Sequence, residues 1–69
     1  MTFRDLRERY GSEWVIRDDP TPSATRRQQL DDWERKAQPD LTMNLWAADA
    51  VELGEQLAEQ ERLLEKARA

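Results

Sequence analysis

Two pairs of adjacent carboxylates, Asp18-Asp19 and Asp31-Asp32, are the first candidates for chemistry in this sequence of 69 residues. Two carboxylates divide acid and base roles only when burial and a fixed separation push their pKa values apart. Neighbouring residues in a turn have neither property, and the calcium-loop pattern with its glycine and terminal glutamate is absent. We therefore interpret both pairs as turn and capping residues.

Nucleophilic and phosphate-binding chemistry also lacks its usual residues. The sequence has no Cys and no His, and hence no thiol, no imidazole and no common zinc or haem ligand set. Ser12 and Ser23 therefore have no histidine base, and neither lies in a Gly-x-Ser-x-Gly elbow. Only Gly11 and Gly54 are glycines, which is too few for a phosphate-cradling loop. We predict no catalytic residue, no cofactor and no metal, and therefore a protein that is not an enzyme.

Arginine is the charged residue with most promise for binding. Arg17, Arg26 and Arg27 are candidates for contacts with an anion or a nucleic acid, because guanidinium groups grip phosphates and carboxylates. Carboxylates are interleaved with them, as at Asp18 and Asp19, so ordinary surface ion pairs suffice to explain the pattern and are the stronger interpretation. The sequence leaves both interpretations open.

Composition places the chain among small, acidic, folded proteins. Its length allows one domain, and 38% hydrophobic residues with three Trp predict a thin core that a partner supplements. The net charge of −4 comes from residues 37–69, so non-specific binding to nucleic acid is disfavoured. There is no apolar run of about 18 residues and no signal-peptide pattern. We expect a cytoplasmic protein that makes no membrane contact.

The chemistry-bearing residues must be positioned by short elements. Thr2 and Asp5 form a box-like helix start, and Phe3, Leu6 and Tyr10 share one stripe, so we predict a helix over 2–10. Gly11 is expected to end it in the left-handed conformation.

The pattern in the middle of the chain predicts mainly strands. Residues 13–17 alternate, with Trp14 directed into the core, and the double proline after them predicts a turn. We predict a strand over 23–28, a short helix over 30–37 and a strand over 41–46. An all-helical middle, beginning at Ser23, is the alternative.

The last third of the chain predicts a long helix over 50–67. Asp49 and Glu52 have the spacing of a helix start, and basic residues suit the opposite end. The expected fold is a small α+β domain over residues 1–69, with a three-stranded antiparallel sheet and helices on one face.

Several segments carry a resemblance to known sequences: Trp14-Val15-Ile16, Ala24-Thr25-Arg26-Arg27, the Ala-Asp-x-x-Glu-Leu start at residues 48–53, and Leu-Ala-Glu-Gln-Glu at 57–61. In these the chain resembles short uncharacterised proteins that are common in actinobacterial genomes. The resemblance supports a strand over 23–28. It implies no activity.

The long helix should reach nearly 28 Å, which is longer than strands of five or six residues. Leu57 should be covered, whereas Leu63 and Leu64 should overhang and invite a partner helix or a second copy. Gln60 in the same stripe could set the register of that contact. Trp46 and Trp33 are candidate interface anchors, with covering the sheet as the alternative. The candidate interface residues are Trp33, Trp46, Leu57, Gln60, Leu63 and Leu64.

From these features we expect a protein–protein interaction or accessory regulatory module, which self-associates through its C-terminal helix as a homodimer. The first alternative is a nucleic-acid-binding regulator that uses Arg26 and Arg27, since the element order is similar to double-stranded RNA-binding domains. Its second helix would then begin with acidic residues, which suits phosphate poorly. The second alternative is a phage or mobile-element inhibitor of a host protein.

Overall fold

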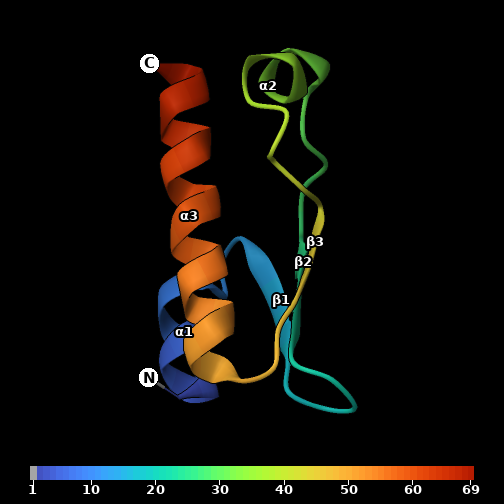
Figure 1. The fold of residues 1–69 in the computed structure, drawn as a ribbon, viewed down its shortest axis with the longest axis vertical. Coiled ribbons are helices and arrows are strands. Elements are labelled where there is room, and N and C mark those ends of the chain that lie inside the picture. The colour runs from blue at the N-terminus through green and yellow to red at the C-terminus, as the bar shows by residue number, and fades with distance from the viewer. Residues whose placement is uncertain (1) are drawn as a thin grey trace.

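The computed structural model describes residues 2–69, so Met1 of the expected domain lies outside the described residues. It has an α+β fold in which helices and a three-stranded antiparallel sheet form two layers (Figure 1). The elements in chain order are α1 (Phe3–Tyr10), β1 (Trp14–Arg17), β2 (Ser23–Arg26), α2 (Asp32–Ala37), β3 (Asn44–Trp46) and α3 (Ala50–Arg68). The predicted fold class is confirmed, and the strand at Ser23 rules out the all-helical middle.

Local hydrogen bonds cap both ends of helix α1. The Thr2 hydroxyl accepts from the Asp5 amide and the Asp5 carboxylate accepts from the Thr2 amide, which confirms the capping box. The expected left-handed Gly11 is wrong, because its φ of −64° and ψ of −19° continue the helical backbone. Glycine is needed there for space, since a Cβ would collide with the Arg7 carbonyl oxygen.

The sheet has the order β1-β2-β3, with both pairs antiparallel. Ile16, Ala24 and Leu45 lie opposite one another and point towards the helices. The strands are shorter than the sequence predicts, since the expected 23–28 ends at Arg26 and the expected 41–46 begins at Asn44. Residues 41–43 leave the strand because Leu41 turns towards α3 and the Thr42 amide bonds to the Gln60 side chain.

The main apolar core fills the space between α1, the N-terminal half of α3 and the inner face of the sheet. In Figure 1 both helices lie on the same side of the sheet. This core consists of Leu6, Tyr10, Trp14, Ile16, Ala24, Leu45, Ala47, Leu53 and Leu57. The expected burial of Trp14 and Leu57 is therefore confirmed.

A second, smaller cluster lies at the other end of α3. It consists of Leu30, Leu41 and Leu63, with Leu64 partly buried beside it. The expectation that Leu63 overhangs is wrong, because the segment between β2 and β3 extends past the strands and covers it. Leu64 is half-buried, so the apolar stripe of α3 is largely covered by its own chain.

Candidate functional site

Arg26 lies at the end of β2, where the main core meets the second cluster. It is only 9% exposed, and its guanidinium lies 4.2 Å from the centre of the Trp14 ring. Nε donates to the Thr42 carbonyl oxygen at 2.7 Å, and Nη2 donates to Gln60 Oε1 at 3.0 Å. This position argues against the surface role that the sequence suggested for Arg26, because most of the guanidinium is occupied inside the protein.

Gln60 joins three segments of the chain. Its Oε1 accepts from Arg26 Nη2 and from the Thr42 amide, both at 3.0 Å, and its Nε2 donates to the Asp40 carbonyl oxygen at 3.0 Å. We call Arg26, Asp40, Thr42 and Gln60 the polar layer. The expectation that Gln60 sets the register of a partner helix is wrong, since the side chain is buried and bonded within its own chain.

The electrostatics of Arg26 follow from its burial. Loss of hydration lowers its pKa from the usual value, while the charges of Glu13 and Glu34 act in the opposite direction and Arg68 adds to the lowering. Within residues 2–69, no carboxylate lies close enough to form a direct ion pair with it. Two neutral acceptors and an aromatic ring hold this cation instead.

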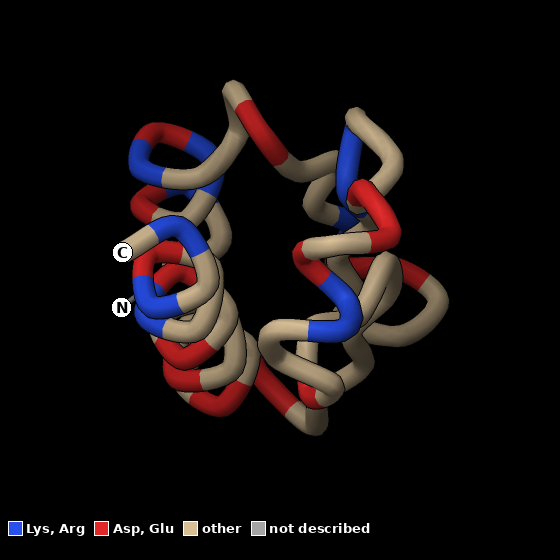
Figure 2. Tube along the Cα trace, turned by 90° about the horizontal axis from the view of Figure 1, so that it is seen from above, with Lys and Arg blue, Asp and Glu red and all other residues tan. Residues whose placement is uncertain are grey.

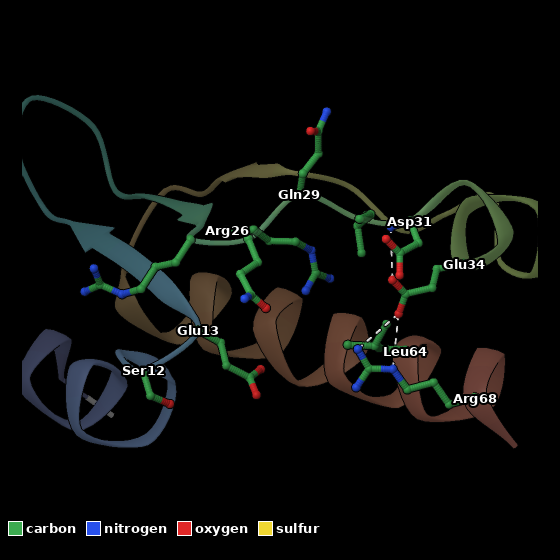
Figure 3. A pocket seen from close by; sticks show the side chains of 11 residues that line it. Ser12, Glu13, Arg26, Gln29, Asp31, Glu34, Leu64 and Arg68 are labelled. Atoms are coloured by element: carbon green, nitrogen blue, oxygen red, sulfur yellow. Dashed lines mark hydrogen bonds and ion pairs between the residues drawn. The ribbon is translucent and has the colours of Figure 1, made fainter.

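A cavity of about 540 Å³ opens beside Arg26, between the end of β2, α2 and the C-terminal part of α3. Figure 3 shows that Glu34 of α2 and Arg68 of α3 join across it. The Arg68 guanidinium contacts Glu34 Oε2 at 3.1 Å, and Glu34 Oε1 accepts from the Asp31 amide. Gln29 points away from the cavity. The Glu34–Arg68 ion pair thus holds α2 against α3.

Arg27 has a structural partner as well. Its Nε donates to the Gly11 carbonyl oxygen at 2.8 Å, which ties the segment after β2 to the end of α1. The carboxylate pairs also follow the interpretation given from the sequence, since Asp18 lies 3.7 Å from Arg7 and Asp31 caps α2. Among residues 2–69, no group of three or more Asp or Glu side chains is arranged to hold a metal ion.

Within residues 2–69, no helix covers the opposite, outer face of the sheet (Figure 1). We define it as Val15, Arg17, Ser23, Thr25, Asn44 and Trp46, the residues that alternate with the buried ones. Trp46 is 64% exposed at one corner. Ser23 lies between it and Arg17, so the three form one row across the strands. Thr25 Oγ1 donates to Asn44 Oδ1 at 2.9 Å in the next row.

Three outward carbonyls at the sheet edges are occupied, in contrast to this face. The pairing directs the carbonyls of Asn44 and Trp46 away from β2, because Met43 and Pro22 supply the acceptors of the flanking ladder bonds. Thr42 Oγ1 donates to the Asn44 carbonyl and Gln56 Nε2 donates to the Trp46 carbonyl.

At the β1 edge, Arg7 Nε likewise donates to the Ile16 carbonyl. Edge acceptors that already have donors are a poor template for an added strand.

The remaining predicted residues are dispersed. Trp33 is 51% exposed on α2, at the far end of the molecule from Trp46. The sequence reasoning missed the stacking of Arg26 on Trp14, although both lie on the buried side of strands that pair directly opposite each other. Pairing register was the missing information, because alternation alone does not say which residues face each other.

Charge is unevenly distributed along α3. Figure 2 shows acidic residues along one side of α3 and basic residues near its C-terminal end. Glu52, Glu55 and Glu59 of this helix are exposed. Among the described residues, no helix combines the length and the apolar character needed to span a membrane. No family model, curated protein or solved structure matches this chain. The resemblance to actinobacterial proteins therefore stays a prediction.

Proposed function

We propose that this protein is a non-enzymatic protein–protein interaction module, and that its contact surface is the outer face of the sheet. The observation that carries the proposal is Trp46, which is 64% exposed on a face that no helix of the described chain covers. Tryptophan is the residue type most enriched among residues that dominate binding energy. Burying such a side chain against a partner removes a large apolar area from water.

The surroundings of Trp46 favour a contact with a protein surface. The neighbouring outer-face residues Ser23, Thr25 and Asn44 are uncharged, so few charges lose hydration when the face is covered. The occupied edges disfavour a partner that adds a strand. A flat contact on the face is the arrangement that remains.

We place the contact on the outer face of the sheet and not on the C-terminal helix. Leu63, which the sequence predicts to overhang, is buried within its own chain, as is the interface candidate Leu57, so neither is available to drive association. The two arginines proposed to contact nucleic acid have other roles, because Arg26 is buried and Arg27 donates to the Gly11 carbonyl. This disfavours nucleic-acid binding. The acidic side of α3 repels phosphate in addition.

The experiment is site-specific photocrosslinking in the cells that make the protein. A photoreactive phenylalanine analogue replaces Trp46 in one variant and the exposed Glu55 of α3 in a matched control. We expect a discrete protein adduct from position 46 and none from position 55. Equal labelling at both positions, or no adduct at position 46, would overturn the proposal. Single-stranded oligonucleotide as the adduct at position 46 would replace it with nucleic-acid binding.

A further inference from the structure

The outer face has a cation at one end of a row and an aromatic ring at the other. Arg17, Ser23 and Trp46 lie opposite one another on β1, β2 and β3. Adjacent strands are about 4.8 Å apart, so the Cα atoms of Arg17 and Trp46 are separated by roughly 10 Å. Arg17 and Trp46 therefore lie at about equal distances on either side of Ser23, but one is a cation and the other an aromatic ring.

Neither end of the row has a partner within the described chain. Arg17 is exposed and takes part in no ion pair or side-chain hydrogen bond among residues 2–69. Elsewhere the chain does place arginine over aromatic rings, at Arg26 on Trp14 and at Arg9 on Tyr10. No such contact joins Arg17 to Trp46 in the described structure.

A two-fold axis that lies parallel to the strands and passes over β2 exchanges the two ends of this row. Building on the proposed function, we propose that the partner is a second copy of this chain, packed face to face so that Trp46 of each copy covers Arg17 of the other. Ser23 then lies opposite Ser23, and Thr25 opposite Thr25. Such a contact is isologous and closes at two copies.

Charge selects this axis over its rival. An in-plane axis perpendicular to the strands that runs along this row would place Arg17 over Arg17 and leave two like charges facing each other. The same axis placed between the two rows would put Arg17 over Val15, which offers the charge no partner. The proposed axis instead gives each guanidinium an aromatic face, an attraction that strengthens when water is excluded. Two such contacts form in each dimer.

The expected dimer is weak, because the outer face consists of two rows of three residues. Stable interfaces bury about 800 Å² per partner, and two rows of mostly small side chains supply less. We therefore expect association at tens of micromolar or above, with the two Arg17–Trp46 contacts contributing much of the affinity.

The first measurement is a double-mutant cycle by sedimentation equilibrium. Trp46→Ala and Arg17→Ala should each weaken the dimer about tenfold, since each removes both cation–π contacts. The double variant should be little weaker than either single variant, because the second change has nothing left to remove. Additive losses would overturn the pairing. Circular dichroism checks that these exposed substitutions leave the fold intact.

The second measurement maps the axis with a short bismaleimide crosslinker, which is clean because the sequence has no Cys. Ser23→Cys and Thr25→Cys both lie on the proposed axis and should both crosslink to dimer efficiently, because each faces its own copy. The control Glu59→Cys on α3 should not. Crosslinking through position 23 and not through position 25, or through neither, would overturn the proposed axis.

The outcomes separate this inference from the proposed function. A chain that stays monomeric up to millimolar concentration, while position 46 crosslinks another protein in cells, overturns the second copy as partner and leaves the interaction module standing. A dimer that is indifferent to both Trp46→Ala and Arg17→Ala overturns the use of this face by a second copy.

Discussion

The two halves of α3 are held to the rest of the molecule by different kinds of interaction, apolar burial in one and polar contacts in the other. The N-terminal half buries Leu53 and Leu57 in a core of nine residues, whose only polar side-chain groups are the Tyr10 hydroxyl and the Trp14 indole N–H. The C-terminal half begins at the polar layer, where Gln60 makes three hydrogen bonds, and ends at the Arg68–Glu34 ion pair. The second cluster, which has three buried residues, lies between the polar layer and this ion pair.

The difference shows how a short chain anchors a long helix when it has few apolar residues. Apolar burial is non-directional, so the N-terminal half tolerates small shifts of its neighbours. The polar layer needs each partner in place, since a buried donor without an acceptor costs about 1–3 kcal/mol. It therefore fixes the register between α3 and the segment after β2.

The largest effect should come from the apolar half. Leu57→Ala removes a fully buried side chain from the centre of the main core and should lower the free energy of unfolding by about 4 kcal/mol. Leu63→Ala, in the smaller cluster, should lower it by about 2 kcal/mol. Urea unfolding followed by circular dichroism measures both. Equal losses would mean that the two clusters form one continuous core.

The polar layer is tested by two glutamines of the same helix. Gln60→Leu leaves the Arg26 guanidinium and the Thr42 amide without their acceptor, and should lower the free energy of unfolding by about 3 kcal/mol. Gln56→Leu loses only one exposed bond to the Trp46 carbonyl and should cost about 0.5 kcal/mol or less.

Guanidinium chloride unfolding of the two variants supplies the comparison. If Gln60→Leu matched Gln56→Leu, the second cluster alone would hold the C-terminal half, and the distinction between the two halves would fail.

The smallest effect concerns the start of α1, at the apolar end. Hydrogen bonds from Thr2 lower the pKa of Asp5 below its usual value of 3.8. A carboxyl with a lowered folded-state pKa stabilises the fold above its unfolded pKa, and this contribution is lost as the pH falls through the folded value. Asp5→Asn should therefore be less stable than the parent at pH 7, with the gap closing in acid.

Urea midpoints from neutral to acidic pH measure that gap. A constant difference across the range would assign the loss to the altered cap geometry and not to the charge of Asp5.

The fold class and the order of elements could be predicted because local signals agree there. The Thr2–Asp5 and Asp49–Glu52 spacings both form the expected helix caps, and alternation located Trp14 in the core. Residues 27–28 and 41–43 were predicted as strand and are not, because their polar groups bond to distant partners such as Gly11 and Gln60. Such contacts leave no local pattern in the sequence.

The candidate site was predicted in part for the same reason. The exposure of Trp46 followed from alternation within one strand. The row that it shares with Arg17 depends on the pairing of β1 with β2 and of β2 with β3. The burial of Leu63 depends on a segment that folds back from more than twenty residues earlier in the chain, so the length of the helix alone could not predict it.

The donors that Arg7, Thr42 and Gln56 supply to the outer carbonyls of β1 and β3 bear on how far assembly can go. A sheet with free borders recruits strand after strand and grows without limit. Here side chains of the same chain already donate to three of the outward carbonyls, those of Ile16, Asn44 and Trp46. An added strand would find fewer free acceptors at either edge, whereas the proposed contact through the outer face would close at two copies.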